Sequence, residues 1–169
     1  MDVLSTYRIL KAKAFNEDID DSWTDWAIEM MEAGNVSDNL HMLAGVSTPY
    51  NQFELQELTS KVLQDLRLDY SNKDSVLSNY VCFLLSTAID HPEDYVKTLR
   101  ELRDIYYQSG MDSRLKDFYL LYYAKEDLTV DVVQWYWEGA NRENIHQLIR
   151  GRFQNWINNF KHERSGTTA

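Results

Sequence analysis

With 169 residues and 44% hydrophobic content, the chain is long enough for one globular domain with its own core and too apolar for wholesale disorder. Its net charge of −10 argues against binding to nucleic acid or to an anionic membrane surface, since both attract cations, and favours a basic protein partner. The single cysteine excludes an internal disulfide, and no apolar run is typical of a signal peptide or a membrane span, so we expect a cytoplasmic protein.

Apolar residues recur at helical spacing from the start of the chain, which predicts a first helix over residues 3–15. The side chains expected on its inward face are Leu4, Tyr7 and Leu10. A second helix is expected to begin at Ser22, whose hydroxyl suits an N-cap. It is expected to end at Ala33, because Gly34 suits the left-handed position after a helix end.

This second helix separates its apolar side chains from its acidic ones. At about 100° per residue, the face expected to pack inward carries Trp23, Trp26, Ala27, Met30 and Met31. The opposite face, expected to meet solvent, carries Asp25, Glu29 and Glu32. The pattern therefore predicts a helix that buries its tryptophans and exposes its carboxylates.

Seven further helices follow from the same period and from capping residues. The expected ranges are 37–45, 51–66, 74–88, 92–110, 113–124, 129–139 and 141–160. In the helix expected over 129–139, Val133 and Trp137 are the inward residues. No stretch alternates with a period of two, so the fold class is predicted to be all-α, with eight or nine helices and no sheet.

No proline-rich or serine-rich linker interrupts the chain, which predicts a single all-helical domain over residues 1–162 and a frayed tail over 163–169. Pairs of expected helices recur roughly every forty residues, a spacing typical of helical-hairpin repeats. This spacing is compatible both with a solenoid-like stack of αα hairpins and with a compact helical bundle.

The sequence carries no catalytic or metal-binding signature. Its six glycines are too scattered for a phosphate-binding loop, and its four histidines are not at helical ligand spacing. The acidic run NEDIDD lacks the glycine and the closing glutamate of a calcium loop, and Cys82 lies in an apolar run where a thiol is a poor nucleophile. We therefore expect a protein that is not an enzyme and needs neither metal nor cofactor.

Arg152 is unusual because it falls within the apolar stripe of the last expected helix, near Leu148 and Trp156. One interpretation is structural: the arginine is buried against a carboxylate of the core, or its stem lies over the tryptophan. The other is a polar recognition site beside an aromatic surface. The sequence leaves both open, and the structural one is the commoner in proteins.

The strongest candidate for function is an acidic segment. Between Ala14 and Ser60 there are ten aspartates and glutamates but no lysine or arginine. Acidic helix faces are often simply solvated, but a surface of one sign also steers a partner of opposite charge. The residues expected to bind a partner are Asp18, Asp20, Asp21, Asp25, Glu29 and Glu32, with Tyr50 as an aromatic anchor.

Three stretches carry a resemblance to a group of small all-helical bacterial proteins. They are WTDWAIEMMEAGNVSDNLHMLAGV, NQFELQELTSKVLQDL and YWEGANRENIHQLIRGRFQNWI, so the likeness extends from about Trp23 to Trp156. These proteins resemble the acidic immunity proteins that accompany bacterial toxins in contact-dependent and polymorphic toxin systems. The matching residues are expected to be core and capping positions, namely Trp23, Trp26, Gly34, Leu40, Leu43, Ala44 and Trp156. The resemblance implies a shared fold and supplies no catalytic residue.

The functional expectation is therefore an immunity-type antidote whose acidic face binds and occludes a basic toxin domain. The alternative is a helical-repeat adaptor that binds a peptide or helix of a partner protein in a groove. A hydrolase that uses paired carboxylates is the third reading, but the acids are expected on exposed helix faces, where nothing shapes a pocket.

Overall fold

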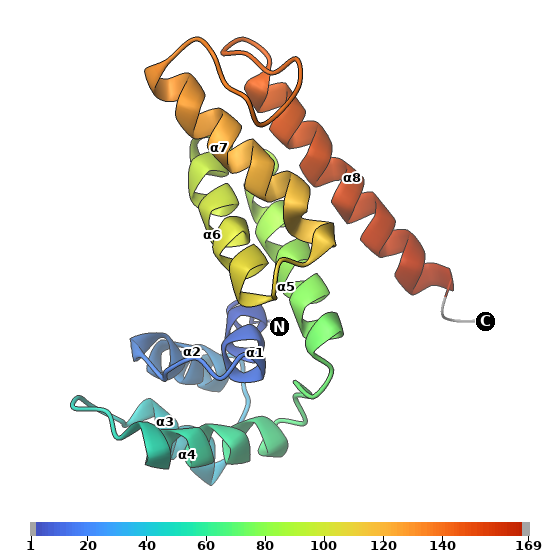
Figure 1. Ribbon diagram of the computed structural model, residues 1–169. Helices are drawn as coiled ribbons and strands as arrows, with labels where there is room; N and C mark the ends of the chain where they lie inside the picture. Colours follow the sequence, from blue (N-terminus) through green and yellow to red (C-terminus); the bar gives the residue numbers. More distant parts are fainter. Residues whose placement is uncertain (1–2, 167–169) are drawn as a thin grey trace. The chain divides into compact units, whose positions relative to one another are not determined.

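The computed structural model describes the backbone of residues 3–166 and the side chains as far as His162. The described residues form eight α-helices and two short 3₁₀ turns, with no strand among them, which confirms the all-α prediction (Figure 1). The chain divides into two compact units, Met1–Tyr80 and Val81–Ala169. Helix α5 (Lys73–Ala88) spans the boundary between the units. That residues 1–162 form a single domain stays a prediction.

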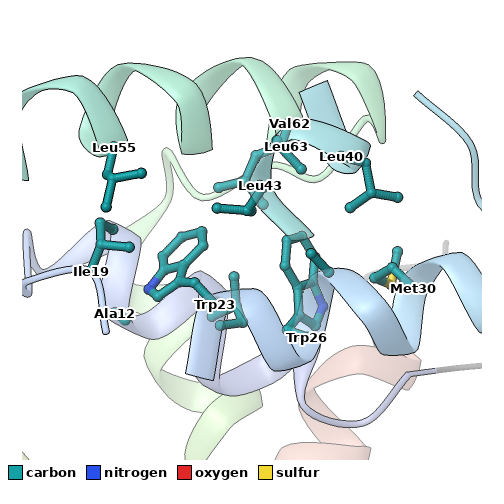
Figure 2. Close-up of a cluster of buried hydrophobic side chains, with 12 residues drawn as sticks. Ala12, Ile19, Trp23, Trp26, Met30, Leu40, Leu43, Leu55, Val62 and Leu63 are labelled. Carbon is teal, nitrogen blue, oxygen red and sulfur yellow. The ribbon is translucent and has the colours of Figure 1, made fainter. Parts of the chain in front are cut away.

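The first unit packs its helices around two tryptophans. Its elements are α1 (Thr6–Ala14), α2 (Asp21–Glu32), α3 (Asp38–Ala44), α4 (Gln52–Asp65) and the start of α5. As Figure 2 shows, Trp23 and Trp26 of α2 point toward apolar side chains of α3 and α4. These apolar neighbours include Leu40, Leu43, Leu55, Val62 and Leu63.

The two tryptophans fix the orientation of α2. Both are buried, with ring centroids 6.0 Å apart and planes at 84°, a favourable edge-to-face arrangement. The Trp26 indole Nε1 donates a hydrogen bond to Thr6 Oγ1 at 3.0 Å, which ties α2 to α1. Burying an aromatic side chain of this size contributes roughly 4–6 kcal/mol before the entropic cost of ordering the chain. The predicted inward face of α2 is thus confirmed for its tryptophans.

The ends of α2 follow ordinary capping chemistry, with one correction. The N-cap is Asp20 rather than the expected Ser22, because the Asp20 carboxylate accepts the Ser22 backbone N–H at 3.0 Å. At the other end Gly34 has φ +92°, and the Asn35 N–H reaches back to the Met30 carbonyl at 3.0 Å. This is the expected glycine-terminated helix end, in which the left-handed residue satisfies otherwise free carbonyls.

The inward face of α1 was predicted correctly for Leu10, which is half-buried and packs against the core, and wrongly for Leu4 and Tyr7. Leu4 and Tyr7 are exposed, by 58% and 38%, whereas Ile9, Ala12 and Lys13 are buried. An apolar-periodicity argument does not anticipate a buried lysine, and the ammonium of Lys13 has hydrogen-bond acceptors inside the unit.

The second unit contains the rest of α5, a 3₁₀ turn (Pro92–Asp94), α6 (Tyr95–Gln108), a second 3₁₀ turn (Ser113–Leu115), α7 (Lys116–Val130) and α8 (Ile145–Gly166). Helices α6 and α7 form an antiparallel pair (Figure 1). Phe153 of α8 is fully buried and lies edge-on to Phe118 of α7 and Tyr95 of α6, with centroids 5.9 and 5.3 Å away. These rings join the three helices into one core.

The helix predicted over residues 129–139 is absent, and α7 is followed by a loop that lasts until α8. The backbone of Asp131 is extended and ends the helix. The Gln134 side-chain oxygen then accepts the N–H groups of Tyr136 and Trp137, both at 2.8 Å, so these donors do not bond along a helix. Val133 is exposed and Trp137 is half-buried, instead of both facing inward as predicted.

The last helix is longer than predicted. It was expected to end near residue 160 and to be followed by a frayed tail over 163–169, but α8 extends to Gly166. Residues 167–169 of the predicted tail lie outside the described residues.

Candidate functional site

The acidic face is the surface formed by Asp18, Asp20, Asp21, Asp25, Glu29 and Glu32, and all six side chains are exposed. Asp21, Asp25 and Glu29 succeed one another at intervals of four residues, so they share one side of α2. That side points away from the core because Trp23, Trp26, Ala27 and Met30 occupy the opposite side. The structure thus places Asp21, Asp25, Glu29 and Glu32 on one exposed side of α2, while Asp20 is the N-cap of this helix and Asp18 lies in the segment before it.

Hydrogen bonds within the first unit hold three of these carboxylates. Asp20 caps α2, Glu29 accepts the hydroxyl of Ser5, and Asp21 accepts the hydroxyl of Tyr50. Among the described residues, no lysine, arginine or histidine forms an ion pair with any of the six acids. The nearby cation Lys11 pairs with Glu17, which is not part of the acidic face.

Tyr50 belongs to this surface, although its hydroxyl is already engaged. It is half-buried, and its hydrogen bond to Asp21, together with partial desolvation and the negative charge of that carboxylate, raises the pKa of the phenol. Any contact that Tyr50 makes with a partner would therefore use its ring.

The two sequence segments hold almost equal numbers of acids, but the first holds fewer lysines and arginines and is therefore the more negative. Residues 1–80 hold 14 acids and 6 lysines or arginines, a net charge of −8, whereas residues 81–169 hold 13 and 11, a net charge of −2. The field of the first unit is therefore strongly negative, and an approaching cation is attracted to it more than to the second unit.

A groove that the sequence did not predict lies between α3, α4 and the loop that joins them. Its volume is about 450 Å³, within the range of pockets that bind ligands. The apolar lining residues are Met42, Val46, Pro49, Leu55 and Leu58, and the polar ones are Asn39, Ser47, Asn51, Glu54, Glu57 and Lys61. Single-sequence periodicity could not find it, because the side chains of two helices and a loop combine to form it.

The loop after α7 is a second exposed feature that the sequence analysis missed. Trp135 is 89% exposed, and Val132 is 69% exposed. The loop is nevertheless well braced, since Gln134 bonds to its backbone and Tyr136 stacks on Tyr123 with ring centroids 5.2 Å apart. The run VDVVQWYW could have indicated it, because three β-branched residues and Asp131 are poor helix formers.

For Arg152 the structural interpretation fits better. Its guanidinium pairs with Asp117 of α7, and both side chains are partly exposed. The pair links α8 to α7 at the edge of the core of the second unit. An exposed ion pair of this kind contributes little to stability, and Arg152 is not the buried arginine of the prediction.

The described residues contain no cluster of three or more histidine, cysteine, aspartate or glutamate side chains that could hold a metal ion. Cys82 is half-buried, with Sγ 3.9 Å from the Ser86 hydroxyl. Within the same residues, no helix is both long and apolar enough to cross a membrane.

Comparisons of the chain with protein-family models, with curated proteins and with solved structures find no match. The function must therefore be inferred from the surfaces described above, of which the acidic face and the adjoining groove are the most distinctive.

Proposed function

We propose that this protein is a binding protein without enzymatic activity, and that its acidic face docks a basic protein partner. The observation that carries the proposal is the exposure of six carboxylates on α2 and in the segment that leads into it, where none forms an ion pair among the described residues. Unpaired exposed acids are free to meet the cations of a partner, and they lose less solvation than buried ones.

The partner that best suits this surface is a basic toxin domain, and the protein would act as its immunity-type antidote. A nuclease attracts phosphates to a basic site, and a carboxylate-rich helix presents a comparable array of negative charge to that site. Occlusion of the site would then block the toxin. The sequence resemblance to immunity proteins described above supports the same class of partner.

Electrostatic steering gives the proposal a measurable consequence in the triple variant Asp25→Lys, Glu29→Lys and Glu32→Lys. We expect its association with the partner to slow by about 10- to 10³-fold at low salt, and the salt dependence of the association rate to flatten. The partner to use is the secreted protein encoded beside this chain, provided that its C-terminal domain is basic. Stopped-flow association kinetics and protection of toxin-expressing cells measure the effect.

A matched control reverses the charge of Asp94, Glu138 and Glu143, which are exposed residues of the second unit. This control changes the net charge by the same amount, so we expect a much smaller effect on association. Circular dichroism should show unchanged helicity in both variants. Unchanged kinetics and full protection by the first triple variant would remove the acidic face from the mechanism.

A second candidate function is a helical adaptor, and the exposed loop around Trp135 favours it. Tryptophan is enriched at the centres of protein interfaces, and this one is presented by a braced loop. An adaptor that uses this loop would bind an apolar partner surface with little dependence on salt. The salt dependence of binding therefore separates the two candidates.

A further inference from the structure

We propose that the groove between α3 and α4 receives an apolar side chain from a lysine- or arginine-rich segment of the partner. The groove and the acidic face would then form one docking surface, with charge to attract the partner and an apolar contact to hold it. This inference rests on the proposed function, because it names the part of a basic partner that the first unit recognises.

The apolar walls of the groove explain why an apolar side chain fits. Leu55 is buried, Val46 and Leu58 are half-buried, and Met42 is 61% exposed. These side chains present carbon atoms to a space of about 450 Å³ that the described residues of the first unit leave open. Displacing water from such walls is favourable by about 25 cal/mol for each Å² of apolar surface buried.

The rim of the groove explains why the segment should be basic. Glu54 is exposed and forms no ion pair among the described residues. Glu57 forms an ion pair with Lys61, in which Oε1 and Nζ are 2.6 Å apart. Asn39 at the other edge donates a hydrogen bond to the Asp65 carboxylate at 2.8 Å. Lys61 is the only cation among the lining residues, so an acidic segment would meet repulsion there and a basic one would find partners.

Tyr50 connects the groove to the acidic face. Its two chain neighbours, Pro49 and Asn51, line the groove, and its hydroxyl donates a hydrogen bond to Asp21 of α2. A segment with an apolar side chain in the groove therefore lies beside the carboxylates of the acidic face. Interfaces commonly combine such an apolar anchor with a charged rim, in which the anchor supplies affinity and the rim supplies association rate.

The test is a selection from a phage-displayed library of random peptides on three immobilised proteins. One is the wild type, and the second is Ser47→Trp, which places a bulky ring in the groove from an exposed loop position. The third, Phe53→Ser, is the matched control, since Phe53 is 83% exposed on α4 but does not line the groove. Fluorescence polarisation of the selected peptides then measures affinity.

We expect the wild type and Phe53→Ser to enrich peptides with an apolar residue flanked by lysine or arginine. Ser47→Trp should weaken the binding of these peptides by about tenfold or more, the loss expected for one buried apolar side chain. Methyl resonances of Met42 should shift when the peptide is added to the wild type.

Three results would overturn the inference. The first is equal binding to Ser47→Trp, the second is enrichment of neutral or acidic peptides, and the third is the absence of any selected peptide. Each leaves the proposed function open to its own test, because the triple lysine variant of α2 and the cell-protection assay do not depend on the groove. Loss of protection in that variant alongside unaltered protection by Ser47→Trp would retain the acidic face and reject the groove.

Discussion

The ammonium group of Lys13 lies inside the first unit and makes hydrogen bonds only to neutral groups. Its Nζ donates to the Gln56 carbonyl at 2.7 Å, to the Gln56 side-chain oxygen at 2.9 Å and to Thr59 Oγ1 at 2.9 Å. Among the described residues no carboxylate pairs with it, and desolvation lowers the pKa of Lys13 below 10.5. The hydrogen bonds of Lys13 join α1 to α4, but its ammonium group loses part of its hydration.

The lowered pKa of Lys13 predicts an effect on stability at alkaline pH. Between the folded pKa and 10.5, the unfolded chain still holds the proton that the folded chain has lost. The free energy of unfolding therefore rises with pH in this window, by up to about 1.4 kcal/mol for each pH unit. The difference between wild type and Lys13→Met should show this rise, because the tyrosines contribute equally to both proteins.

Urea denaturation at several pH values measures this difference. Lys97→Met is the matched control, since Lys97 is exposed and its removal should leave the pH profile unchanged. Parallel profiles for wild type and Lys13→Met would show that the buried amine has an ordinary pKa.

At the scale of elements, the ends of the helices depend on residues in the left-handed region. Gly34 has positive φ, as expected, and among the other described residues so do two glycines and three residues that are not glycine, namely Gly110, Gly139, Asn16, Arg67 and Met111. Arg67 follows α4 with φ 54°, and the Leu68 N–H bonds to the Leu63 carbonyl at 2.8 Å. An L-residue with a long side chain pays about 1–2 kcal/mol for this conformation, whereas glycine does not.

Replacing this arginine should therefore stabilise the protein. We expect Arg67→Gly to raise the free energy of unfolding by roughly 0.5–1 kcal/mol, the relief of strain less the extra freedom of glycine in the unfolded chain. Arg67→Ala is the control, because it removes the side chain but keeps the Cβ that causes the strain, and it should give no gain. Chemical denaturation distinguishes the two, and equal stabilities of the glycine and alanine variants would contradict the strain argument.

The braced loop after α7 shows how the hydrogen bonds of one side chain can favour a loop where a helix was predicted. The stretch 129–139 has apolar residues at helical intervals, but the Gln134 amide bonds locally to the N–H of Tyr136 and to the carbonyl of Ala140. A side chain that hydrogen-bonds to nearby backbone groups gives them an alternative to helical hydrogen bonds and so reduces the stability gained by forming a helix. The consequence for function is an exposed tryptophan where a packed helix was expected.

At the scale of the whole chain, the net charge of −10 favours attraction of a basic partner but also destabilises the folded state by repulsion. Like charges repel one another in the folded state, and within α2 the pair Asp25 and Glu29 is spaced unfavourably. Salt shortens the range of this repulsion, from about 30 Å at 0.01 M to about 8 Å at 0.15 M.

The melting temperature should therefore rise when salt is added between these two concentrations. Each reversal of an acid to lysine changes the charge by two, so the triple variant of α2 carries −4 in place of −10. We expect a smaller rise in that variant. Differential scanning calorimetry measures the melting temperatures of both proteins. Equal rises would mean that repulsion among the carboxylates of the acidic face does not destabilise the folded protein.

The sequence by itself determined the helical class, most helix ranges and the exposure of the acids on α2. These features follow from local rules, because the helical period, the capping residues and the opposition of tryptophan and carboxylate operate within a few residues. Only the tertiary structure decided that Lys13 faces inward, that Tyr50 reaches Asp21 and that α3 and α4 leave a groove between them. Each of these features depends on side chains that are distant in sequence, or on a surface shared by several elements, and a local pattern carries no information about which distant groups will meet.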